Sequence, residues 1–276
     1  QDTPNLITAV SALSGTGKNA TFTVSAGSAS GNALVASKID GTIYWSWHIW
    51  VTDESSLASV VTNGYQVMDR NLGAINATPG DPGVMGLIYQ GGRKDPFPPV
   101  AAFTPSGNYI PMKPLYPPSG LTPLTDPITI TPAPANVNLG GAINNPTFYY
   151  RASFGTSNWY GQLAEKRVGL WGIMYKSDFD PCPAGWQVFN ENVFLNFVPQ
   201  TMTNGGYEYL GNYYPAQGYL NYSSVTLTFL VVEQSAWIWS LWNMGQERGI
   251  AMQINNTINA AAFTTYGFPV RCIREQ

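Results

Sequence analysis

The sequence predicts a β-rich α+β fold, and three features of the chain support this expectation. Short runs of β-branched and aromatic residues recur along the chain, with glycine and asparagine turns between them. Only two short helices are expected. The stretch from about residue 75 to 147 is too rich in proline and glycine to hold long helices or central strands. With 276 residues, the chain is long enough for one large β-domain or two small domains.

The first 40 residues are expected to form an N-terminal β extension, either complete in itself or the end of a larger domain. Small and β-branched residues alternate in residues 20–25 and 33–36, and glycine and serine separate the two runs, which predicts two strands. Residues 43–51 combine tyrosine, tryptophan and β-branched residues without helical spacing. They predict a strand that is buried on much of both faces.

Residues 41–276 are expected to form the main domain, with a proline- and glycine-rich insertion at about 75–147. An insertion of this length is either a disordered linker or an ordered loop held on a scaffold. Tyrosine, phenylalanine and methionine residues within it favour the ordered loop. One short helix is expected at about 84–90, and another at 191–197 after Asn190, a good N-cap residue.

Beyond about residue 200 the pattern returns to short strands and glycine or asparagine turns. No break in composition follows residue 150, so the same domain is expected to continue to the end of the chain. The expected strands lie at residues 207–210, 225–232, 249–254 and 268–273.

The composition argues for an exported protein that does not bind nucleic acid. Charged residues make up 11% of the chain, against about 25% in an ordinary soluble domain. The net charge is −3, and no cluster of lysine and arginine is long enough to follow a phosphate backbone. No apolar run approaches the length of a membrane span. A surface rich in amides, hydroxyls and aromatic rings is typical of secreted β-proteins and adhesins.

The two cysteines bear on the compartment. Residues 1–4 lack the features of a signal peptide, which fits either a cytoplasmic protein or a mature exported one. Cys182 and Cys272 are an even, widely spaced pair, which fits one disulfide in an oxidising compartment. Two unrelated buried thiols are the alternative. The disulfide favours an extracellular or cell-surface protein.

Residues for catalysis are scarce, so no enzyme, no cofactor and no metal site is expected. The single histidine, His48, lies in the aromatic strand at 43–51 and is expected to be a hydrogen-bonded structural residue. One histidine also excludes histidine-rich zinc sites. Asp178 and Asp180 predict an Asx-turn in preference to a pair of calcium ligands.

The aromatic content is the positive signal for binding, with nine tryptophans and sixteen tyrosines. Three tryptophans lie close to an amide-rich stretch near the C-terminus, a combination suited to sugars or protein partners. The alternative is a core strand followed by a polar loop. The expected ligand-binding residues are Trp237, Trp239, Trp242, Asn243, Gln246, Arg248, Gln253, Asn255, Asn256 and Tyr266.

Five motifs occur in order: WSWHIWVT (45–52), MDRNLG (68–73), GLIYQGGRKDPF (86–97), YKSDFDPCPAGW (175–186) and GFPVRCIR (267–274). Together they resemble the FISUMP family, the Fibrobacter succinogenes major paralogous domain of exported Bacteroidetes lipoproteins and fimbrial proteins. The resemblance covers about residues 40–276.

The resemblance implies a C-type-lectin-like fold with long irregular loops, and it implies that Cys182 pairs with Cys272. Related C-terminal modules serve diversity-generating retroelements, and the displayed surface would here run from about residue 237 to 266. The Glu-Pro-Asn and Gln-Pro-Asp loops of calcium-dependent sugar sites are absent from the sequence. Binding is therefore expected to be calcium-independent.

The sequence thus predicts a non-enzymatic adhesive or ligand-binding domain of a bacterial surface or pilus-tip protein. Its expected partner is a host or bacterial surface protein or a glycan. The alternatives are a phage receptor-binding protein, or a structural pilus subunit that pairs with other subunits through its N-terminal strands. Arg93, Lys94 and Asp95 are expected to form a structural ion network that holds the long loop in place.

Overall fold

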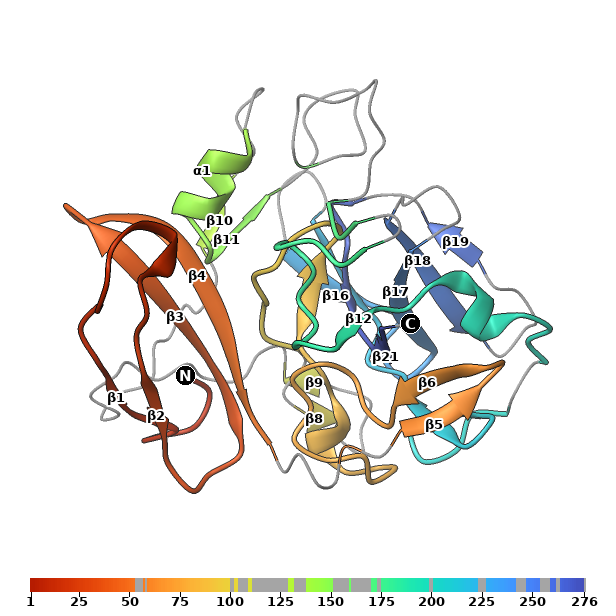
Figure 1. Cartoon of the computed structure of the whole chain (residues 1–276). Coiled ribbons are helices and arrows are strands. Elements are labelled where there is room, and N and C mark those ends of the chain that lie inside the picture. Colours follow the sequence, from red (N-terminus) through yellow and green to blue (C-terminus); the bar gives the residue numbers. More distant parts are fainter. Residues whose placement is uncertain are drawn as a thin grey trace.

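The chain is described by a computed structural model, and its architecture is β-rich with few, short helices (Figure 1). No described helix is both long enough and apolar enough to cross a membrane. The structure describes residues 1–52, 57, 59–99, 102–103, 109–110, 129–131, 138–150, 159, 170–172, 175–198, 201–222, 227–241, 247–253, 259–261 and 264–275.

The N-terminal strands form a β unit that lies to one side of the rest of the molecule (Figure 1). Strands β1 (Ile7–Val10) and β2 (Val24–Ala26) pair antiparallel. Strands β3 (Gly31–Ile39) and β4 (Thr42–Val51) form an antiparallel hairpin that is paired from end to end. A short 3-10 helix, η1 (Gly17–Asn19), precedes β2.

The hairpin spans the domain boundary that was expected at residue 40. Asp40 and Gly41 form its tight turn, with φ of 49° and 79°, and Asp-Gly is a favoured pair for such a turn because both positions need a positive φ. Strand β4 therefore belongs to the N-terminal β unit. Burial on its two faces is less complete than expected, since Ser46 is buried, most of the other residues are half-buried, and Thr42 and Tyr44 are exposed.

Two four-stranded sheets form the centre of the main body. The first has the order β12 (Trp186–Val188), β21 (Cys272–Arg274), β6 (Tyr65–Met68), β5 (Ser59–Thr62). The second has the order β16 (Leu227–Leu230), β15 (Tyr219–Tyr222), β20 (Gly267–Pro269), β7 (Ile88–Gln90). The consecutive strands β20 and β21 are inner strands of the two sheets, so the C-terminal segment joins them.

Smaller sheets surround this centre. Strand β17 (Ser235–Leu241) pairs with β18 (Glu247–Gln253), which pairs with β19 (Asn259–Ala261). Three two-stranded sheets complete the described strands. They are β13 (Gly206–Tyr209) with β14 (Asn212–Pro215), β8 (Ala102–Phe103) with β9 (Tyr109–Ile110), and β10 (Thr129–Thr131) with β11 (Phe148–Tyr150).

The helices differ from the expectation. The expectation of a helix at 84–90 is wrong. Residues Pro82–Val84 form a single 3-10 turn, η3. Residues Ile88–Gln90 form strand β7, because they pair with β20. The second helix is shorter than expected, a 3-10 helix η4 (Glu191–Phe194) capped by the Asn190 side chain. Helix α1 (Leu139–Asn144) was not expected.

The largest core cluster surrounds the two cysteines. It contains aromatic residues from strands that are distant in sequence, including Tyr89, Trp239 and Phe268. A second cluster lies beneath η4 and the β13–β14 hairpin and includes Phe194 and Tyr207. The side chains of these aromatic residues are almost fully buried, so much of the tryptophan and tyrosine content is structural.

Candidate ligand-binding groove

Trp237 and Trp239 belong to the core, so the expectation that they form a binding surface is wrong. Trp239 is fully buried; its indole N–H donates to the Tyr89 carbonyl at 2.6 Å, and its ring packs against Phe268. Trp237 is 9% exposed and stacks on Phe268 at a centroid distance of 5.0 Å. Tyr266 is half-buried against the same cluster. The alternative of a core strand is confirmed for β17.

The other expected ligand-binding residues are placed only in part. Arg248 and Gln253 lie on β18, where they pair with Ser240 and Ser235 of β17, and the structure describes their backbone alone. The remaining five lie outside the described residues: Trp242, Asn243, Gln246, Asn255 and Asn256.

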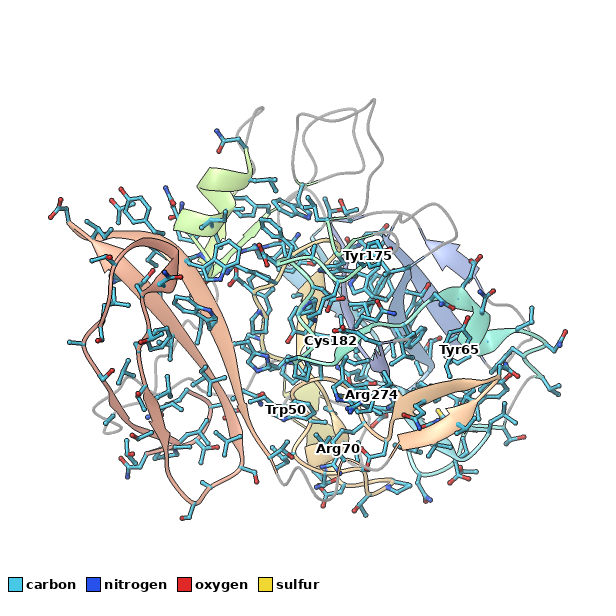
Figure 2. All side chains as sticks on the ribbon, in the orientation of Figure 1. Trp50, Tyr65, Arg70, Tyr175, Cys182 and Arg274 are labelled. Atoms are coloured by element: carbon cyan, nitrogen blue, oxygen red, sulfur yellow. A yellow bond between two sulfur atoms is a disulfide. The ribbon has the colours of Figure 1, made fainter. Side chains whose placement is uncertain are left out.

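The structure has a groove elsewhere, between the N-terminal β unit and the loop that leads into β12. The groove has a volume of about 580 Å³, within the range of pockets that bury a small ligand. Its side chains come from residues 45–52 of one wall and 178–186 of the other, with Leu57, Leu72 and Lys94 between them. Trp50 lies where the β3–β4 hairpin faces the body (Figure 2).

A buried ion cluster attaches the β4 wall to the body. The Lys94 ammonium donates to the Ser46 carbonyl at 2.9 Å, to the Ser46 hydroxyl at 2.5 Å and to Asp95 at 2.6 Å. The Ser46 hydroxyl donates to the same Asp95 oxygen at 2.5 Å. Burial lowers the pKa of Lys94, and the Asp95 carboxylate opposes this effect. All three ammonium protons of Lys94 thus have acceptors within the protein.

Arg93 extends this cluster to the segment between α1 and β11. Its guanidinium is 2% exposed and donates to the carbonyls of Phe148 and Pro146. It lies 3.7 Å from an Asp95 oxygen and over the ring of Tyr150. The three consecutive charges therefore hold both β4 and the end of the 75–147 insertion against the body.

His48 lies on β4 and contacts β7 as a neutral, hydrogen-bonded residue. Burial lowers its pKa from 6.5 to about 3. Its Nδ1 is 3.1 Å from the Tyr89 hydroxyl, and its Nε2 is 2.9 Å from the Asn32 side-chain oxygen. Because the Asn32 oxygen is an acceptor, the tautomer that fits carries its proton on Nε2 and accepts from Tyr89 at Nδ1. The expectation of a structural histidine fits this arrangement.

The tryptophans on the β4 wall have fixed positions. Trp45 is half-buried, with the Lys94 ammonium 4.6 Å from its ring centroid and Phe179 in an edge contact at 5.6 Å. Trp47 packs on Phe22 of the N-terminal β unit at 4.8 Å. A ring that the fold already holds loses little conformational entropy when a ligand packs on it.

Trp50 and Trp186 are similarly held from outside the groove. The indole N–H of Trp50 donates to the Ala74 carbonyl at 3.1 Å. Trp186 is half-buried at the start of β12, and the Arg274 guanidinium lies 5.3 Å from its ring centroid. Both walls thus bring partly exposed indole rings to the groove.

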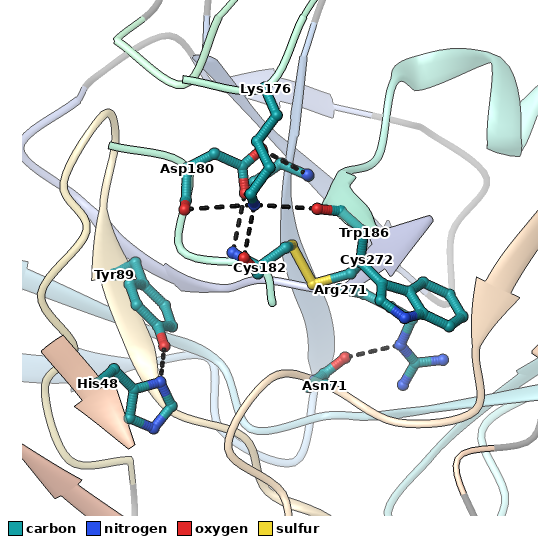
Figure 3. The surroundings of a disulfide bond; sticks show 10 residues. His48, Asn71, Tyr89, Lys176, Asp180, Cys182, Trp186, Arg271 and Cys272 are labelled. Atoms are coloured by element: carbon teal, nitrogen blue, oxygen red, sulfur yellow. Dashed lines mark hydrogen bonds and ion pairs between the residues drawn. A yellow bond between two sulfur atoms is a disulfide. The ribbon is translucent and has the colours of Figure 1, made fainter. Parts of the chain in front are cut away.

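A disulfide fixes the second wall. Cys182 is bonded to Cys272 of β21, with an S–S distance of 2.06 Å and a Cα–Cα distance of 6.0 Å. The pairing agrees with the expectation from the sequence. Because β21 is an inner strand, the disulfide ties the wall to the centre of the fold (Figure 3).

Asp180 and Lys176 organise the loop around this disulfide (Figure 3). One Asp180 oxygen accepts from the Lys176 ammonium at 2.9 Å and from the Cys182 N–H at 2.8 Å; the other accepts from the Val188 N–H at 2.9 Å. The bond to the residue two positions ahead is the expected Asx-turn. Lys176 also donates to the carbonyls of Cys182 and Trp186.

The charges that line the groove differ in what they can offer a ligand. Burial raises the pKa of Asp180, and Lys176 and the backbone N–H groups oppose the shift; its oxygens already accept three hydrogen bonds. Lys94 is saturated by its own contacts. Asp178 is exposed on the lining of the groove. Among the described lining residues, the carboxylate of Asp178 is thus the accessible charge.

Comparisons of the chain with protein-family models, with curated proteins and with solved structures find no match.

The groove was not predicted from the sequence, although both of its walls contain residues that drew attention. Residues 45–52 and 175–186 were recognised as motifs. Their apposition depends on contacts between distant segments. Trp45 meets Phe179 of the other wall, and Lys94 and Asp95 hold Ser46 against the body. The signal that was available is the combination of tryptophan, proline and aspartate in these two motifs.

Proposed function

We propose that the chain is a non-enzymatic, calcium-independent ligand-binding domain of an exported bacterial surface or pilus-tip protein, and that it binds its ligand in the groove. The observation that carries the proposal is the groove itself, whose two walls are held rigidly by a buried ion cluster and by a disulfide. Partly exposed aromatic rings with a few fixed polar groups are typical of binding pockets.

The arrangement of titratable groups favours binding over catalysis. His48 is neutral and hydrogen-bonded on both ring nitrogens, so it is poorly placed to transfer a proton. Asp180 is occupied by Lys176 and two backbone N–H groups. A general acid or base needs a free group within reach of the substrate, and the described lining offers Asp178 alone.

We also propose that the domain belongs to the FISUMP family and has a C-type-lectin-like fold. The five ordered motifs support this assignment, and so does the bond between Cys182 and Cys272. The disulfide further supports an oxidising, extracellular location.

The experiment that tests the proposed function is a binding screen of the whole chain against glycans and host surface proteins, with EDTA present throughout. Ala184 is exposed and lines the groove, so Ala184→Trp adds a bulky side chain to the site without removing a core contact. We expect this variant to lose at least about tenfold in affinity, equivalent to about 1.4 kcal/mol.

Two further variants make the screen specific to the groove. Val61→Trp is the matched control, because Val61 is 64% exposed on β5 and does not line the groove; it should bind like the wild type. Trp242→Ala probes the C-terminal loops. Loss of binding with Trp242→Ala but not with Ala184→Trp would contradict the groove as the binding site.

A further inference from the structure

We infer that the groove takes an uncharged oligosaccharide and discriminates against acidic glycans. The inference rests on the proposed function, because it names the class of ligand for the same site. It follows from the charge and the surface chemistry of the described lining.

The described lining has no cation available for an acidic ligand. Lys94 is the lysine that lines the groove, and its three ammonium protons are donated to Ser46 and Asp95. A carboxylate or sulfate in the groove would find no free ammonium proton on Lys94 to accept. The exposed Asp178 would instead repel it, and juxtaposed like charges are a common means of rejecting a wrong partner.

The described carboxylates that line the groove are Asp178 and Asp180, and the two of them are not placed to hold a metal ion. Among the described residues, no group of three or more histidine, cysteine, aspartate or glutamate side chains is placed to hold a metal ion. Asp180 is fully occupied by Lys176, Cys182 and Val188. Asp178 can therefore act as a direct acceptor for ligand hydroxyl groups, and such charge-assisted hydrogen bonds are stronger than neutral ones.

The apolar part of the lining suits a ring with non-polar C–H faces. Trp45, Trp50 and Trp186 are half-buried, so each exposes part of an indole ring. Pro181 and Pro183 add rigid apolar surface beside them. A sugar ring combines such C–H faces with a rim of hydroxyl groups, which matches a wall of indole and proline edged by a carboxylate.

The test is titration of the whole chain, in excess EDTA, with three sets of probes followed by tryptophan fluorescence and calorimetry. The first set is neutral trisaccharides built from glucose, galactose, mannose and N-acetylglucosamine. The second is sialylated and sulfated galactose oligosaccharides, and the third is a lysine-rich peptide. We expect at least one neutral trisaccharide to bind, and its acidic counterpart to bind at least about tenfold more weakly.

Variants of Asp178 examine the charge argument directly. Asp178→Ala should weaken binding of the neutral sugar by about tenfold, in line with loss of a charge-assisted hydrogen bond. Asp178→Lys should bring acidic oligosaccharides into the groove. Glu208→Lys is the matched control, because Glu208 is an exposed acid on β13 away from the groove; it should change neither affinity.

The outcomes separate this inference from the proposed function. Acidic sugars that bind as tightly as neutral ones, and are blocked by Ala184→Trp, would overturn the inference and leave a ligand-binding groove. Binding of the lysine-rich peptide alone, with loss in Asp178→Ala, would do the same and point to a cationic ligand. If no probe of any set binds, and no ligand from the wider screen depends on Ala184, both proposals fail.

Discussion

At the residue scale, Asp95 is the centre of the attachment between the N-terminal β unit and the body. Its carboxylate is buried beside two cations, Lys94 at 2.6 Å and Arg93 at 3.7 Å. The Asp95 oxygen that accepts from Lys94 also accepts from the Ser46 hydroxyl. Removing one partner of a buried ionic cluster leaves uncompensated charge, and this costs more than the cluster contributes when it is intact.

Asp95→Asn should therefore be strongly destabilising although it keeps the shape of the side chain. We expect the free energy of unfolding to fall by about 3–5 kcal/mol, measured by guanidinium denaturation. Asp178→Asn is the matched control, because Asp178 is exposed; it should stay within about 0.5 kcal/mol of the wild type. Equal stability of the two variants would refute this account of the cluster.

The protonation of His48 makes the stability of the protein depend on pH, and it can be followed directly by NMR. The folded pKa of His48 is about 3 and the usual value is 6.5, so the unfolded chain binds the extra proton between these pH values. The contribution of His48 to the free energy of unfolding is fully present above about pH 6.5 and is lost as the pH falls toward 3. At pH 4 the loss amounts to about 3 kcal/mol. The His48 NMR signal should show no titration between pH 8 and 5. An NMR titration midpoint near pH 6.5 would show that the ring is solvated. In His48→Gln, the free energy of unfolding should depend less on pH between 6.5 and 4.

At the element scale, the loop at 176–188 depends on both its disulfide and its buried ion pair. Cys182 is tied to β21, and Lys176 closes the loop through Asp180 and two carbonyl groups. The disulfide closes a loop with a sequence separation of 90 residues. A long closure of this kind restricts the unfolded chain more than a short one does.

Reduction of the disulfide should therefore lower the free energy of unfolding by about 4 kcal/mol, on the chain-entropy model. Guanidinium denaturation with and without reductant measures the difference, with Cys182→Ser/Cys272→Ser as the genetic equivalent. We expect ligand affinity in the groove to fall as well, because the loop forms one wall. Retained stability after complete reduction would show that packing alone holds the loop.

Some of these elements could be predicted from the local sequence, and others could not. Strand β4 follows from local composition, since β-branched and aromatic residues fill it after the turn at Asp40 and Gly41. The segment at 84–90 could not be assigned locally, because β20 recruits Ile88–Gln90 into a sheet. Helix α1 was missed because Gly140 and Gly141 lie within it, and glycine is a poor helix former.

The candidate site could be predicted even less well, because burial is a tertiary property. Trp237 and Trp239 suggested a surface by their proximity to amides, yet Phe268 of β20 packs against both. Conversely, Trp45 and Trp50 were expected in a strand buried on much of both faces and are only half-buried. Local sequence gave the residue types of a binding site, whereas pairing between distant strands decided which ones stay accessible.

At the scale of the whole molecule, residues 267–274 connect the two four-stranded sheets of the body. Strand β20 pairs with β15 and β7, and β21 pairs with β12 and β6. The segment also contains Cys272 and the buried Arg271, which donates to the Tyr213 carbonyl at 2.7 Å. Strands β1 and β2, by contrast, expose most of their side chains.

Hydrogen exchange should therefore rank these regions in a definite order. Amides open with free energies that rise from near zero at exposed edges to the global value in the core, so residues 267–274 should exchange slowest and residues 7–10 and 24–26 fastest among the strands. Exchange followed by mass spectrometry on the whole chain measures both. The Asp95→Asn variant sharpens the test, because loss of the ion cluster should speed exchange in β4 before it affects β20 and β21. Equal acceleration of β4, β20 and β21 would mean that the N-terminal β unit and the body unfold together, and that the groove lies within one cooperative unit.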